Sequence, residues 1–203
     1  MTKYRSASLS DRLGPYWKME QGCALVFPPL AFGLTRPTSL ISITVLALAL
    51  IACCSTLWVG GAYWRAVWTR LQGGRASMPG ALRMAARWKV PGLVVTAISM
   101  IVSSLNIGFQ GVSSASLGAW GLSLLAVLEY INYYHFQLQN FDHGPTWRRF
   151  LRRRAFPRAH MAKDLELFLS RSGRPIAAST MLSRASASGP GGTSRPDAAC
   201  PPE

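Results

Sequence analysis

The chain has 203 residues, of which 49% are hydrophobic and only 15% are charged. Soluble domains average about 25% charged residues, so this composition argues against an ordinary cytosolic enzyme. The 22 Lys and Arg residues against 8 Asp and Glu residues give a net charge of +14, which also argues against an acidic disordered protein. Four cysteines in this length are too few for a disulfide scaffold.

The first 21 residues are polar and of mixed charge, and no apolar run begins among them. A secretory signal would place an apolar run directly after a short basic start, so we expect no cleaved signal peptide. Residues 22–35 are apolar but only 14 residues long, with Pro28 and Pro29 inside them. That length fits a re-entrant or kinked segment as well as a span. A helix that began at Tyr16 would reach about 20 residues and could cross a bilayer.

The clearest span lies between residues 38 and 64. No charged residue occurs over the 24 residues from Leu40 to Tyr63. As a helix this run would cover about 36 Å, more than the thickness of a hydrocarbon core. Aromatic and basic residues follow at its end, as is typical of a cytoplasmic membrane interface. They are Trp58, Trp64, Arg65, Trp68 and Arg70.

Two further apolar runs, residues 90–109 and 112–134, are separated only by Gln110 and Gly111. Each run is long enough for a membrane-spanning helix. We therefore predict a helical hairpin with a very short turn on the non-cytoplasmic side. Pro91 is expected in the first turn of its helix, where the missing N–H group is tolerated.

Charge asymmetry orients these segments. The predicted loop 65–89 holds six basic residues and no acid, and residues 136–174 hold nine basic residues against three acids. The predicted turn 108–113 has no charge, and residues 35–39 have only Arg36. By the positive-inside rule the loop and the C-terminus are cytoplasmic. Four spans place the basic N-terminus on the same side, whereas three would export it, so we favour four.

The C-terminal third is basic and then of low complexity. Residues 138–171 are expected to form juxtamembrane helices, the second of which should carry Ala162, Leu165, Phe168 and Leu169 on one face. The arginines that we expect to contact anionic lipid headgroups are Arg148, Arg149, Arg152, Arg153 and Arg154. Nucleic acid is not an expected partner, because a basic run beside a span indicates lipid contact first. Residues 172–203 are rich in Gly, Pro, Ser and Ala and are expected to be disordered.

Glu129 is the acidic residue that falls within a predicted span. An ionised carboxylate in the bilayer is costly unless it is paired or hydrated, so such residues face the bundle interior. We therefore define an intramembrane polar cluster of Glu129, Asn132, Tyr133 and His135. The cluster could be a proton relay, a metal site or a ligand pocket, or a set of hydrogen bonds that fixes helix packing. We favour the structural interpretation.

No metal site, cofactor or catalytic residue is expected. Glu129 and His135 are six residues apart, about 240° around a helix, so one straight helix cannot bring both to one ion. The sequence has no HExxH motif, no nucleotide-binding loop and no nucleophile elbow. The Cys53–Cys54 pair lies within the clearest span, and we interpret it, like Ser99 and Ser103, as small packing residues.

Three stretches of the chain carry a resemblance. They are Gly60 to Arg65, Leu128 to Leu138 with the following Phe141 and Asp142, and Arg158 to Leu165. Over roughly residues 20–170 the chain resembles uncharacterised small bacterial multi-span integral membrane proteins of unassigned function. The resemblance implies a bacterial membrane protein, and it implies no activity, substrate or catalytic residue.

Together these features predict an all-α fold, a polytopic transmembrane helix bundle of about four spans with a cytoplasmic basic helical segment and a disordered tail. The expected parts are a cytoplasmic N-terminal segment (1–21), the bundle with its basic loop 65–89 (22–137), basic juxtamembrane helices (138–171) and the tail (172–203). We expect a multi-pass protein of the inner or plasma membrane with both termini cytoplasmic and no enzymatic activity. It would act through lipid, a partner membrane protein or a second copy of itself. The alternative is a small oligomeric transporter or channel subunit that uses Glu129.

Overall fold

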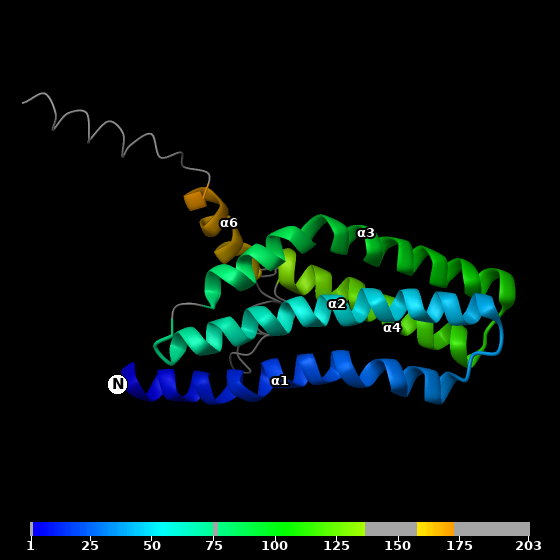
Figure 1. Cartoon of the computed structure of the whole chain (residues 1–203), viewed down its shortest axis with the longest axis horizontal. Helices are drawn as coiled ribbons and strands as arrows, with labels where there is room; N and C mark the ends of the chain where they lie inside the picture. The colour runs from blue at the N-terminus through cyan, green and yellow to red at the C-terminus, as the bar shows by residue number, and fades with distance from the viewer. Residues whose placement is uncertain (1, 75–76, 137–157, 173–203) are drawn as a thin grey trace, which may run out of the picture. The chain divides into compact units, whose positions relative to one another are not determined.

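The fold consists of helices. The computed structural model describes residues 2–74, 77–136 and 158–172, and within these ranges it has five helices and no strand (Figure 1). The helices are α1 (Thr2–Thr35), α2 (Leu40–Leu71), α3 (Met78–Gln110), α4 (Ser114–Tyr134) and α6 (His160–Ser172). The predicted all-α fold is confirmed. The predicted basic run 148–154 and the predicted disordered tail beyond residue 172 lie outside the described residues.

Three helices, α2, α3 and α4, are long and apolar enough to cross a membrane. They contain 32, 33 and 21 residues. At 1.5 Å per residue even the shortest covers about 32 Å, which matches the thickness of a hydrocarbon core. The clear span and the helical hairpin predicted from sequence correspond to these three helices. α1 does not reach the same hydropathy.

The connection between α2 and α3 is much shorter than predicted. α2 continues past its apolar run and α3 begins before the next one, so most of the predicted loop 65–89 is helical. No Gly or Pro interrupts α2 between Arg65 and its end, and Gly73, with a φ of 94°, follows in the turn. Pro91 accordingly lies inside α3 rather than in its first turn, which Pro79 occupies. Proline is tolerated within such apolar helices when neighbouring helices support the backbone.

α1 is one continuous helix, although a polar segment and a separate apolar segment were expected. It runs through three prolines: Pro15, Pro28 and Pro29. α1 lies alongside α2 in the opposite direction (Figure 1) and buries Leu13 and Ala24 in the core. Its stability therefore derives from packing rather than from intrinsic propensity. Residues 22–35 form the second half of this helix and not a re-entrant segment.

Small residues allow α3 and α4 to approach closely. The Ser123 hydroxyl lies 2.7 Å from the Ser99 hydroxyl and 2.9 Å from the Ser103 hydroxyl. All three side chains are buried. Serine pairs of this kind satisfy their own polar groups while they hold two apolar helices together. The contacts agree with the packing role that the sequence predicts for Ser99 and Ser103.

An aromatic-rich core fills the end of the bundle at which α2 ends and α3 begins. We call this the basic end, because it carries Arg65, Arg70, Arg83, Arg87 and Lys89. The core residues there include Leu13, Val59, Tyr63, Trp64, Leu82, Tyr130, Tyr133, Tyr134, Met161 and Leu165. They come from α1, α2, α3, α4 and α6, so one cluster joins all the described helices.

The first part of α6 packs on this core. Met161, Ala162 and Leu165 are buried, and the Tyr63 hydroxyl donates a 2.8 Å hydrogen bond to Oδ2 of Asp164. Phe168, on the predicted apolar face, packs against the core. Leu169 belongs to the same predicted face but is 50% exposed.

Candidate functional site

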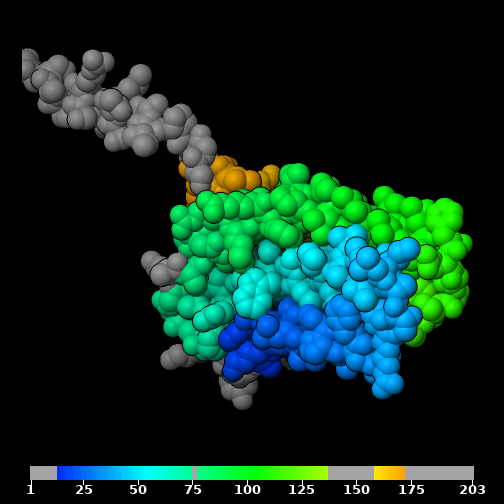
Figure 2. Space-filling model, turned by 45° about the vertical axis from the view of Figure 1, so that its right-hand side comes forward, coloured from blue at the N-terminus to red at the C-terminus, as the bar shows by residue number. Residues whose placement is uncertain are grey.

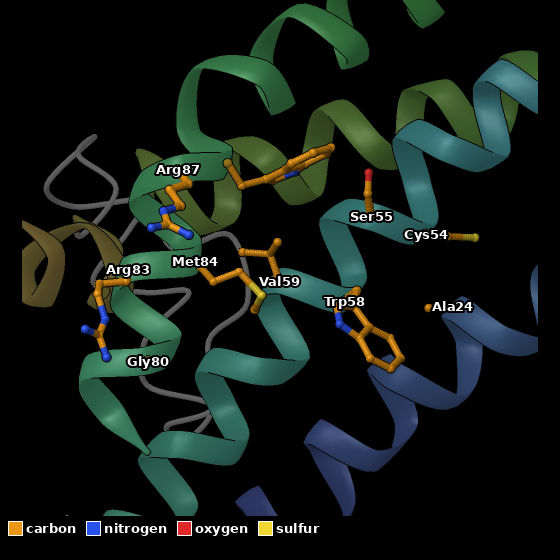
Figure 3. Close-up of a pocket in the computed structure, with 10 residues that line it drawn as sticks. Ala24, Cys54, Ser55, Trp58, Val59, Gly80, Arg83, Met84 and Arg87 are labelled. Atoms are coloured by element: carbon orange, nitrogen blue, oxygen red, sulfur yellow. The ribbon is translucent and has the colours of Figure 1, made fainter. Parts of the chain in front are cut away.

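An open groove lies between α2 and α3 near the basic end (Figure 3). On the face seen in Figure 2, α2 lies between α1 and α3. The groove has a volume of about 740 Å³, which falls within the roughly 300–1,000 Å³ of ligand pockets. Most of its lining is apolar or aromatic: Ala24, Cys54, Trp58, Val59, Gly80, Met84 and Trp88.

Two arginines add charge to the α3 side of the groove. Arg83 and Arg87 are four residues apart, so they share one face of the helix, and both are exposed (Figure 3). Trp88 lies one residue further on, and its Nε1 atom is buried without a hydrogen-bond partner among the described residues. This arrangement suits a ligand with an apolar body and an anionic head.

A second polar site joins α1 to α4. The Tyr133 hydroxyl donates a hydrogen bond of 2.5 Å to Oε1 of Glu20, and Nδ2 of Asn132 donates one of 3.3 Å to Oε2 of Glu129. All four side chains are buried, with exposed fractions of 2% to 8%. Within the described residues, Oε2 of Glu20 is buried without a hydrogen-bond partner. The site therefore holds two buried carboxyl groups with unequal surroundings.

Both carboxyl groups line one small cavity. Its volume is about 140 Å³. The other lining residues are Tyr16, Met19, Cys23, Phe27, Leu57 and Leu125. None of them is a lysine, arginine or histidine, so the described part of the cavity wall supplies no positive charge to the two acids.

Gly60 of α2 makes room for the Tyr133 ring. A Cβ atom at this position would lie 2.1 Å from Cζ of Tyr133, far inside van der Waals contact. At the neighbouring Gly61 a Cβ atom would lie 2.8 Å from Cγ of Gln21 and 3.5 Å from Cβ of Glu20. The two glycines thus let α2 approach α4 and α1 at the same level, and they set the position of the hydrogen bond between Tyr133 and Glu20.

The structure brings together three of the four residues of the predicted polar cluster. Glu129, Asn132 and Tyr133 are buried on α4. His135 is instead exposed at the C-terminal end of that helix, with its ring 5.8 Å from the Tyr130 ring. α4 ends one residue before His135, so this side chain no longer follows the buried face. The five predicted lipid-contacting arginines at 148–154 lie outside the described residues.

Glu20 is the functional residue that the sequence reasoning missed. Tyr16, Glu20 and Cys23 recur at i, i+4 and i+7, which places them on one face of a helix. In the four-span alternative that begins at Tyr16, the sequence places Glu20 at the membrane interface, and the spacing alone does not relate it to Tyr133. Within the described residues, no group of three or more His, Cys, Asp or Glu side chains is placed to hold a metal ion.

Comparison of the chain with protein-family models, with curated proteins and with solved structures gives no match.

Proposed function

We propose that the chain is a non-enzymatic integral membrane protein of four spans that holds an anionic phospholipid in the groove between α2 and α3. The observation that carries this proposal is the pairing of an apolar groove with Arg83 and Arg87 at its side. A phospholipid combines an apolar body with a phosphate head, so each part would meet a matching surface. Basic pockets between transmembrane helices on the cytoplasmic side are known to bind such headgroups.

The distribution of charge supports a cytoplasmic position for the basic end. Five basic side chains belong to that end, whereas the connections at the other end, 36–39 and 111–113, hold only Arg36. By the positive-inside rule the basic end faces the cytoplasm. Arg83 and Arg87 would then lie at the headgroup level of the leaflet in which anionic lipids attract basic residues.

α1 would be the fourth span. From Tyr16 to Thr35 it has about 20 residues, enough to cross roughly 30 Å of hydrocarbon. Lys18 is exposed, with its ammonium group 5.7 Å from the Trp17 ring centroid. A lysine near the end of a span can extend its side chain to the headgroups while its stem stays on apolar surface. The N-terminus would share the cytoplasmic side with the C-terminus.

Replacing Arg83 and Arg87 together with glutamine is expected to weaken the binding of an anionic phospholipid. Each basic side chain at a membrane surface contributes about 1 kcal/mol, so the loss of two corresponds to roughly 30-fold weaker binding. Native mass spectrometry of the full chain, released from detergent micelles doped with phosphatidylglycerol, would count the retained lipid. At high salt the difference in lipid retention between the wild type and the double variant should be smaller, because screening weakens the attraction between the wild-type arginines and the lipid.

Arg70→Gln with Lys89→Gln is the matched control. These two residues carry the same charge at the basic end, are exposed, and do not line the groove. The control is expected to retain phosphatidylglycerol like the wild type. Equal loss of lipid in both double variants would show general charge attraction and would count against a site in the groove.

A further inference from the structure

The cavity between α1 and α4 holds two carboxyl groups and is separate from the proposed lipid site. Glu20 and Glu129 both line it, and the rest of its wall is apolar or uncharged. Two carboxylates close together in a low-dielectric environment cannot both ionise without a compensating cation. Some positive charge must therefore enter the site when the helices pack.

The carboxyl group of Glu20 offers a place for a proton. Its Oε1 atom accepts the hydrogen bond from Tyr133, whereas its Oε2 atom is buried without a partner within the described residues. A buried polar atom without a partner carries a large desolvation cost. A proton on Oε2 would remove the negative charge and turn this oxygen into a donor beside the cavity that Glu20 and Glu129 both line. The cavity also has room for water that could relay the bond.

The groups that face Glu20 offer no alternative source of charge. α1 contributes Tyr16 and Cys23, and α4 contributes Glu129 and Tyr133. On α2, Leu57 lines the cavity, and Cys53, one helical turn earlier, is a buried thiol that supplies no positive charge. Among the side chains that the structure describes, the cations of this region are Lys18 and Arg65, which are exposed and lie over the Trp17 ring rather than along the cavity.

We propose that this cavity is a proton-binding site in which Glu20 and Glu129 hold at least one proton between them. The site lies where α1 meets α4, and Tyr133 connects the two helices through it. Gain or loss of the proton therefore changes how favourably α1 packs against the other helices. The folded protein binds more protons than the unfolded chain, so its stability falls as the pH rises.

Thermal unfolding of the detergent-solubilised full chain between pH 5 and pH 8, in choline chloride, tests the proposal. The wild type is expected to unfold at a lower temperature at pH 8 than at pH 5. Glu20→Gln, which keeps the shape of the side chain but cannot ionise, is expected to lose most of this difference. Glu129→Gln removes the second charge and is expected to reduce it as well, so either variant suffices if the other does not fold.

Glu166→Gln is the matched control, because Glu166 is 61% exposed and pairs with Arg158 at 2.8 Å away from the cavity. It should keep the wild-type dependence on pH. Infrared difference spectra between the two pH values supply a readout that packing alone would not move: the carbonyl band of a buried protonated carboxyl group, present in the wild type and weakened in Glu20→Gln. The proposal is overturned if Glu20→Gln keeps the full dependence on pH. It is also overturned if sodium, in place of choline, stabilises the wild type but not Glu20→Gln at pH 8, since the occupant would then be a metal cation.

Discussion

Replacing Gly60 with alanine is expected to destabilise the protein by about 1–3 kcal/mol, the usual effect of forcing extra atoms into a packed core. The added Cβ atom would lie 2.1 Å from Cζ and 2.3 Å from the hydroxyl oxygen of Tyr133. Tyr133 is only 2% exposed, so its ring has little space in which to move aside. The shift would also lengthen the hydrogen bond to Glu20 and weaken this polar contact between α1 and α4. Thermal unfolding in detergent would measure the effect.

Gly121→Ala is the control for this substitution. A Cβ atom at Gly121, on α4, would meet no atom within 4 Å. Because alanine loses less backbone entropy than glycine in a helix, this variant should be unchanged or more stable by about 0.5–1 kcal/mol. If Gly60→Ala were as stable as Gly121→Ala, the close contact between α2 and α4 would have to be rejected.

Tyr133→Phe is expected to be the second large effect, and one that depends on pH. The substitution keeps the ring but removes the donor to Oε1 of Glu20, whose Oε2 atom already lacks a hydrogen-bond partner within the described residues. The cost of an unsatisfied buried acceptor is about 1–3 kcal/mol and is larger for a charged one. We therefore expect the greater loss at pH 8 and a smaller loss at pH 5, where the carboxyl group is neutral. Thermal unfolding of both forms at the two pH values would show this.

Tyr130→Phe supplies the comparison from the same helix. The Tyr130 hydroxyl donates a 2.9 Å hydrogen bond to the backbone carbonyl of Lys89, an acceptor that does not titrate. Its loss should cost about 0.5–1.5 kcal/mol at either pH. If the loss of stability in Tyr130→Phe depended on pH as strongly as in Tyr133→Phe, ionisation of Glu20 could not be its cause.

Gly60→Ala and Tyr133→Phe, combined in one protein, should destabilise it by less than the sum of their separate effects, because both substitutions act on one contact.

The apolar helices could be predicted from sequence because hydropathy over about 20 residues is a strong local signal. The turn at Gly111 followed from its composition and has a φ of 78°. The ends of α2 and α3 could not be predicted in the same way. Hydropathy indicates where a helix leaves an apolar environment. The charged helical turns that continue α2 and α3 toward the basic end have no such signal.

The candidate sites depend on contacts between distant parts of the sequence. The contact between Glu129 and Asn132 follows from their spacing of three residues on one helix. The hydrogen bond between Glu20 and Tyr133 joins residues 113 positions apart and depends on how α1 packs. The groove likewise forms only because α2 and α3 lie side by side. The sequence alone does not indicate that Arg83 and Trp58 line the same groove.

Four spans with the basic end in the cytoplasm are the central prediction for this protein, and cysteine labelling tests them directly. Single cysteines would be introduced at Thr2, Ser39, Gln72 and Val112 in a background without Cys23, Cys53, Cys54 and Cys200. A membrane-impermeant maleimide should label Ser39→Cys and Val112→Cys in intact cells, and should label Thr2→Cys and Gln72→Cys only after permeabilisation. Labelling of Thr2→Cys in intact cells would leave three spans and contradict the account.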